Sequence, residues 1–95
     1  MPLSPFHECN APGCHEQIHR RYLMCGPHWA MLPGELQADV HAHLRAWRKG
    51  GSVRPYYAAT LRARLYLANA LRFPVAAENC RARLAVIEDG KPVTA

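Results

Sequence analysis

CNAPGC at residues 9–14 and CGPH at residues 25–28 are the two segments that decide the fold of this chain. Together they place three cysteines and one histidine in two close pairs, joined by a short connector. Thiolate sulfur and imidazole nitrogen in paired spacing are the usual ligands of a tetrahedral Zn²⁺ site. Because the protein fills all four positions, the spacing predicts a structural zinc site and not a catalytic one with an open position. The predicted ligands are Cys9, Cys14, Cys25 and His28.

The residues between these ligands favour a closed site. Pro12 fixes φ and Gly13 admits a positive φ, so the first loop can turn both sulfurs toward one point. In the second pair, Pro27 suits the first turn of a helix, because its missing N–H is not needed there. We therefore expect His28 to point back from a helix start toward the metal.

Other interpretations of the cysteines and histidines stay open. The cysteines could be ordinary thiols or a disulfide pair, but the cluster holds an odd number and the fourth cysteine, Cys80, is distant. The first residues lack the basic and apolar stretches of a secretory signal, so we expect the reducing cytoplasm, where clustered cysteines bind metal more often than they pair. His7 or His19 could replace His28 at the metal.

The length of 95 residues indicates one domain, residues 1–95, with a modest core that a metal would supplement. No apolar run approaches the roughly 20 residues that cross a bilayer. The formal charge of +5 favours a polyanionic partner, although a GC-rich genome would also enrich arginine without one.

The N-terminal third predicts a small metal-centred unit. Residues 1–8 are expected to be an irregular lead-in, and residues 9–28 the zinc unit. Between the ligand pairs, residues 16–24 have room for two very short strands. A loop, a hairpin and a helix start around one metal form a treble-clef-like arrangement, which is a likeness of fold and implies no function.

The rest of the chain has the period of helices, so the predicted fold class is mainly α, with this unit followed by two to three helices. The expected helices span residues 33–49, 55–73 and, less firmly patterned, 76–88. Over the last segment, a hairpin around Asp89-Gly90, pairing residues 84–88 with 91–94, is the alternative. Helix is favoured because the flanks are rich in alanine, and Cys80 is then expected to be a small buried apolar residue.

The first long helix carries one apolar stripe. Its members are Leu36, Val40, Leu44 and Trp47, which step by four, four and three residues. We expect this stripe to face Leu61 and Leu65 of the next helix, together with Trp29. Gly50-Gly51 should stop the helix.

The second long helix is apolar on two sides, which is typical of a helix packed between others. Its main stripe is Tyr57, Leu61, Leu65 and Ala68. Its second stripe is Tyr56, Ala59, Ala63, Tyr66 and Ala70. This second stripe should either receive the chain's own last helix or form the seam of a homodimer.

Histidines near zinc raise the possibility of a metal-dependent nuclease. The helix after the zinc unit would have to supply Asp39, His41 and His43 to a second, catalytic metal. Asp39 and His41 lie about 200° apart on a helical wheel, and His43 shares the apolar side of Val40 and Trp47. Because the constellation that a reaction site requires is missing, we expect no enzyme.

Basic residues gather where the zinc loop and the glycine turn are expected. These candidates for nucleic-acid contact are Arg20, Arg21, Arg45, Arg48, Lys49 and Arg54. Tyr22 and Tyr56 could stack on bases beside them. Two further pairs, Arg62 with Arg64 and Arg81 with Arg83, are splayed about 200° apart on their own helices and predict no stripe.

Two other roles compete with nucleic-acid contact. The basic residues at the end of the first long helix could simply offset its dipole. A protein partner would instead use apolar anchors such as Tyr56, Tyr66 or an exposed Trp29. Neither signature excludes the other.

A wider motif includes both ligand pairs and consists of Cys9 with Pro12-Gly13-Cys14, LMCGPHW at 23–29, LP at 32–33 and Leu36. In these residues the chain resembles a group of small zinc-binding proteins from phages and prophages. The likeness runs from about residue 9 to about residue 70. It implies zinc ligation by the same four residues and a bacterial cytoplasm as the setting. The resemblance implies no particular activity. The alternative to direct nucleic-acid binding is therefore a phage-type protein that modulates a host assembly, such as a defence nucleoprotein complex.

Overall fold

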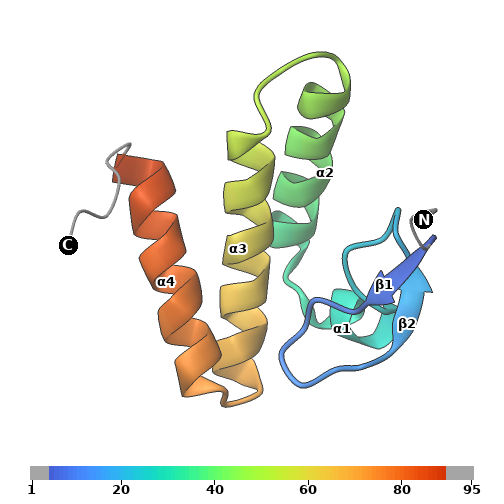
Figure 1. Ribbon diagram of the computed structural model, residues 1–95, viewed down its shortest axis with the longest axis vertical. Helices are drawn as coiled ribbons and strands as arrows, with labels where there is room; N and C mark the ends of the chain where they lie inside the picture. Colours follow the sequence, from blue (N-terminus) through green and yellow to red (C-terminus); the bar gives the residue numbers. More distant parts are fainter. Residues whose placement is uncertain (1–4, 90–95) are drawn as a thin grey trace.

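The computed structural model describes residues 5–89 and is mainly helical, with a two-stranded hairpin near the N-terminus, as the sequence predicts (Figure 1). In chain order the elements are β1 (Phe6–Glu8), β2 (Gln17–His19), α1 (Gly26–Met31), α2 (Gly34–Arg48), α3 (Arg54–Ala70) and α4 (Pro74–Asp89). None of the helices in this described part is long and apolar enough to cross a membrane.

The hairpin does not lie where the sequence predicted it. β1 pairs antiparallel with β2, with Phe6 opposite His19 and Glu8 opposite Gln17. The expected irregular lead-in therefore supplies the first strand, and residues 20–24 form turns instead of a second strand. The reason is that the loop between Cys9 and Cys14 reverses the chain, so the residues on either side run together. The backbone N–H of Cys9 extends the pairing by donating to the Glu16 carbonyl at 2.9 Å.

The glycine pair ends α2 as expected. Gly50 adopts φ 99°, which is open to glycine at no steric cost. Its N–H donates to the Trp47 carbonyl at 2.9 Å, and the Gly51 N–H donates to the Ala46 carbonyl at 3.0 Å. These two bonds form a Schellman cap, which satisfies carbonyls that the helix leaves unpaired.

α3 ends earlier than predicted, at Ala70 and not at residue 73. Arg72 takes the left-handed conformation with φ 63°, and the Phe73 N–H donates to the Ala68 carbonyl at 2.8 Å. This is the same type of cap built without glycine. Pro74 then begins α4, and residues 84–88 lie in that helix, so the hairpin alternative is wrong for them; residues 91–94 lie outside the described residues.

α3 packs between α4 and the rest of the molecule (Figure 1). On one side, Leu61 and Ala58 form a core with Cys80 and Leu84 of α4, and Leu65 packs against it. Cys80 is 5% exposed, which confirms it as a small buried residue. The prediction that Leu61 and Leu65 face α2 is therefore wrong, because α4 covers them.

The other side of α3 is covered by α2 and by the N-terminal unit, which we define as residues 5–32. Ala59 and Ala63 are both 0% exposed and share a core with Val40, Met24 and the buried cysteines. These small side chains allow close approach of the neighbouring backbone. At Ala59 and Ala63 the second stripe is therefore covered by α2 and the N-terminal unit and not by α4. Tyr66 and Ala70 of the same stripe are exposed, and the homodimer seam stays a prediction there.

The apolar stripe of α2 is only partly buried. Val40 is 4% exposed, Leu36 and Leu44 are half-buried, and Trp47 is 43% exposed. The Trp47 ring stacks on Tyr56, with centroids 5.4 Å apart and an interplanar angle of 19°. The expectation that Trp47 faces Leu61 and Leu65 is wrong, because α4 already occupies that face of α3.

Arg62 ties the three long helices together. Its Nη2 lies 2.8 Å from Asp39 Oδ2 on α2, and its Nη1 lies 3.2 Å from Glu88 Oε1 on α4. His43 Nε2 lies 3.0 Å from the second oxygen of Asp39. The guanidinium of Arg62 is therefore neutralised within the fold and is not free for a partner.

Candidate metal centre and basic surface

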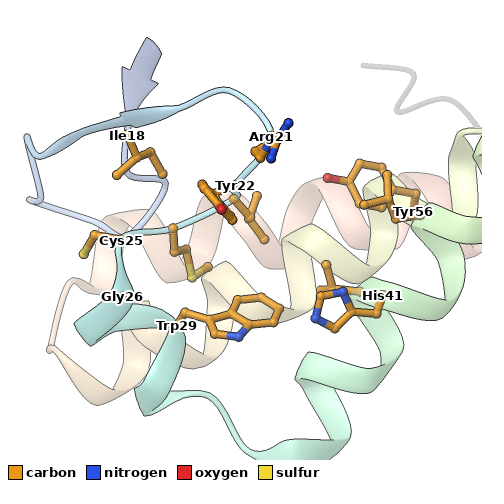
Figure 2. A pocket seen from close by; sticks show the side chains of 12 residues that line it. Ile18, Arg21, Tyr22, Cys25, Gly26, Trp29, His41 and Tyr56 are labelled. Atoms are coloured by element: carbon orange, nitrogen blue, oxygen red, sulfur yellow. The ribbon is translucent and has the colours of Figure 1, made fainter. Parts of the chain in front are cut away.

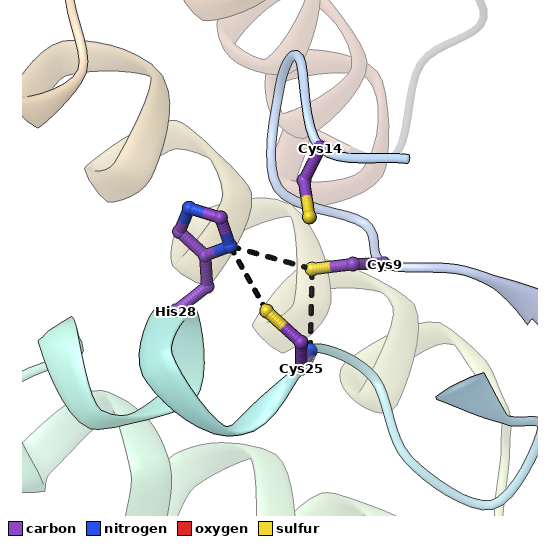
Figure 3. Close-up of side chains that lie close together, drawn as sticks. All are labelled: Cys9, Cys14, Cys25 and His28. Carbon is purple, nitrogen blue, oxygen red and sulfur yellow. Dashed lines mark hydrogen bonds between the residues drawn. The ribbon is translucent and has the colours of Figure 1, made fainter. Parts of the chain in front are cut away.

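Four side chains meet in the N-terminal unit at the position expected for a metal (Figure 3). One ligand atom from each of Cys9, Cys14, Cys25 and His28 lies within 4.8 Å of all the others. His28 Nδ1 is 3.1 Å from Cys25 Sγ and 3.7 Å from Cys9 Sγ. A tetrahedral zinc site with ordinary bond lengths separates nitrogen and sulfur ligands by about 3.6 Å, so the spacing fits such an ion.

The local backbone structure directs each of the four side chains toward the centre of the cluster. Cys9 follows β1, and Gly13 with φ 77° turns the loop back so that Cys14 faces it. Cys25 is the N-cap of α1, and Pro27 lies at the start of that helix, as the sequence predicts. His28 therefore projects from the first turn toward the three sulfurs (Figure 3).

Backbone N–H groups support the Cys9 sulfur. The Cys25 N–H donates to Cys9 Sγ at 3.2 Å, and the Ala11 N–H donates to it at 3.4 Å. Such bonds favour the thiolate, but burial has the larger effect and raises the pKa of the Cys9 thiol to about 11. A bound cation would reverse this balance, because metal binding displaces the thiol proton.

The donor set suits a structural ion. Three sulfurs and one imidazole nitrogen are soft to borderline ligands, which Zn²⁺ binds with four-coordinate geometry. All four tetrahedral positions would come from the chain. Such a site fastens loops together and leaves no position for a substrate.

The alternative histidines lie elsewhere. The two ring nitrogens of His7 lie 2.6 Å from the Glu8 carbonyl oxygen and 2.7 Å from the Tyr22 carbonyl oxygen. His19 Nδ1 accepts a hydrogen bond from the Arg21 N–H at 3.2 Å. Of the three candidates, His28 is therefore the one that joins the cysteines.

The three residues considered for a catalytic metal do not meet at one point, because His41 lies apart from the other two. The Asp39 carboxylate contacts Arg62 and His43, whereas the His41 ring meets Trp29 edge-on, with centroids 5.3 Å apart and an angle of 73°. Within residues 5–88, no group of three or more potential ligands lies close together besides the cysteine cluster. Asp39 and His43 instead serve the ion-pair network of Arg62.

The six predicted basic contacts are all exposed, on the zinc-loop side and around the glycine turn: Arg20, Arg21, Arg45, Arg48, Lys49 and Arg54. In the described part of the chain, none of them forms an ion pair with a carboxylate. Two of them lie in the same region of the surface as Tyr56. Arg21 and Tyr56 line the same pocket, and the charge of Arg48 acts on the Tyr56 phenol.

The predicted anchors for a protein partner differ in exposure. Tyr56 is half-buried against the N-terminal core, and burial raises the pKa of its phenol, so it stays protonated at neutral pH. Tyr66 is 40% exposed on α3. Trp29 is half-buried and packs on the same core as Tyr56.

One convergence of basic residues was missed. Arg64 of α3 and Arg83 of α4 line a small cavity of about 160 Å³, together with Asn10 and Asn79. Helical-wheel reasoning places residues within one helix and cannot reveal arginines that meet across two. The pairing of α3 with α4 was needed to find them.

Comparison with protein-family models, with curated proteins and with solved structures finds no match to this chain. Its function must therefore be argued from the side chains described above.

Proposed function

We propose that this chain is a non-enzymatic binding protein of the phage type, stabilised by one structural Zn²⁺, that contacts nucleic acid through its arginine-rich surface in the bacterial cytoplasm. The zinc is supported by the donor set and spacing of Cys9, Cys14, Cys25 and His28. The phage setting is supported by the resemblance of residues 9–70.

The observation that carries the nucleic-acid role is a set of exposed cations without carboxylate partners. Arg62 shows the contrast, since Asp39 and Glu88 neutralise it. The sequence moreover places no Asp or Glu between Asp39 and Glu78, although α2, the glycine turn and α3 there carry many arginines. A surface of this kind attracts a polyanion and releases its counterions on contact.

A salt titration tests this role. Binding of wild-type protein to DNA should weaken with salt, with a log–log slope near −0.9 per phosphate contact on a duplex. Replacing Arg45 and Arg48 by alanine should flatten the slope by about two units while the metal content is unchanged.

The double variant of Arg81 and Arg83 is the matched control, because it removes the same charge from α4. Its slope should equal that of wild type. Flattening in this control alone would place the contact on α4 and contradict the proposed surface. Absence of any binding at about 50 mM salt would refute the nucleic-acid role itself.

Exposed apolar side chains favour a second candidate, a protein-binding modulator of a host assembly. Tyr66 is 40% exposed, Phe73 is 40% exposed and Val75 is 72% exposed, all on α3, α4 or the turn between them. Interface energy is concentrated in such anchors. Capture of host proteins that survives nuclease treatment and is lost in Tyr66→Ala would favour this candidate over nucleic acid.

A further inference from the structure

A pocket of about 390 Å³ opens between the N-terminal unit, α2 and α3 (Figure 2). Figure 2 shows Arg21, Tyr22 and Tyr56 along one side, and Trp29 and His41 along the other. The volume falls within the range of small-molecule sites in proteins.

The pocket is lined by aromatic and buried aliphatic side chains. Tyr22, Trp29 and Tyr56 supply rings, and the buried Met24 and Val40 also line it. Two of the rings are held in place by neighbours: Trp47 stacks on Tyr56, and His41 packs edge-on against Trp29. Supported rings are suitable surfaces for stacking a planar ligand.

The polar groups at the rim match an anionic, hydrogen-bonding ligand. Arg21 lines the pocket, and Arg48 lies near enough to Tyr56 to act on its phenol. The protonated phenol can donate a hydrogen bond. No aspartate or glutamate is among the lining residues. A purely aliphatic occupant would leave these donors unpaired, which is unfavourable.

We propose that this pocket binds one unstacked nucleobase of a single-stranded nucleic acid, with the adjoining phosphate at Arg21. A duplex keeps its bases paired and stacked, whereas a single strand offers each base face to aromatic side chains. The inference rests on the proposed nucleic-acid role and names the form of nucleic acid and the place where its base lies.

The candidate metal centre supports the side of the pocket that carries Arg21 and Tyr22. Cys25 borders the pocket while its sulfur points away, toward the cysteine cluster (Figures 2 and 3). The turn that carries Arg21 and Tyr22 lies directly before it in the chain. Holding Cys25 at the metal therefore holds that turn over α2 and α3.

The first experiment compares oligonucleotides with wild-type protein, by anisotropy of a labelled strand of about 12 nucleotides. The strands are a homopolymer, an abasic strand of equal length and charge, and the same sequence as a duplex. The homopolymer should bind about 5- to 150-fold more tightly than the abasic strand, which is the range that base–aromatic stacking gives.

These strands separate the two proposals. If neither single strand nor duplex binds, the proposed function fails. If the homopolymer and the abasic strand bind equally, the nucleic-acid role stands and the pocket inference is overturned. A free mononucleotide that binds as tightly as the homopolymer would also overturn it, because the strand would then contribute nothing.

The second experiment changes the pocket. Tyr22 is 57% exposed, so Tyr22→Leu should keep the fold and the metal while removing a stacking face. We expect it to weaken homopolymer binding at least about 5-fold and to leave abasic binding unchanged. Tyr66→Leu, an exposed tyrosine outside the pocket, is the matched control and should match wild type. Equal binding by both variants and wild type would refute the assignment.

Discussion

The two sides of α3 are covered in different ways. On the side of Ala59 and Ala63 lies the N-terminal unit, whose loops carry the cysteine cluster and which packs on these alanines and on Leu67. On the side of Leu61 lies α4, which packs through Leu84 and Cys80. We therefore expect the first face to depend on a metal that holds irregular backbone close, and the second to depend on buried aliphatic area.

The metal-dependent face should show the largest effect. Removing zinc with a chelator, or replacing Cys25 by serine, should cost stability comparable to that of the whole domain, because structural zinc contributes on the order of 10 kcal/mol in small finger peptides. Thermal melting with elemental analysis measures this loss. Cys80→Ala is the matched control, since Cys80 lies outside the cluster, and it should retain one zinc per chain. Unchanged melting of the zinc-free protein would contradict the comparison.

The aliphatic face should depend on its central leucine. Leu61 is 0% exposed, so Leu61→Ala should lower the free energy of unfolding by about 2–5 kcal/mol, through lost burial and the cavity left behind. Denaturant unfolding measures it. Leu65→Ala, a half-buried neighbour on the same face, should lose less, and zinc content should be unchanged in both variants. A loss of zinc in Leu61→Ala would mean that the two faces are not separable.

Gly13 lies where the cysteine loop meets the turn between α3 and α4, so a substitution there tests this contact. It has φ 77°, and a Cβ placed there would lie 2.7 Å from Phe73 Cζ, on the turn between α3 and α4. Gly13→Ala should therefore destabilise the protein by about 1–3 kcal/mol, from backbone strain and displacement of the ring. Gly34→Ala is the control, because nothing lies within 4 Å of its added Cβ, and its melting should be close to that of wild type or slightly higher. Equal melting of both variants would show that the loop does not pack on Phe73.

The sequence predicted what spacing alone determines. The signals that succeeded are local ones. The two ligand pairs predicted the cluster, the proline predicted the start of α1, and the glycine pair predicted the end of α2. The first strand was missed because its partner is distant in the sequence. The nearest paired residues, Glu8 and Gln17, are nine positions apart and lie on either side of the cysteine loop. The end of α3 was missed because Arg72 takes a conformation that usually marks glycine.

The assignment of faces could not be predicted for a different reason. Both stripes of α3 are apolar. Periodicity therefore predicts that each stripe is covered, but it does not predict which element covers it. The alanines pack against the N-terminal unit, which comes close to the α3 backbone there. Leu61 instead packs into the core that α3 forms with α4. The pocket was likewise hidden, because Tyr22, Trp29 and Tyr56 come from three separate segments.

Substitution of Trp47 is expected to have the smallest effect on stability, because the structure places this residue differently from the sequence prediction. A buried tryptophan at the end of the α2 stripe would lose about 3–5 kcal/mol on truncation to alanine. Because Trp47 is 43% exposed and contacts the Tyr56 ring by stacking, we expect Trp47→Ala to cost only about 1 kcal/mol. Denaturant unfolding of Trp47→Ala beside Leu61→Ala measures the ranking directly. A cost for Trp47→Ala equal to that of Leu61→Ala would mean that α2 packs more deeply than its exposure indicates. The difference between the two faces of α3 would then be smaller than the structure implies.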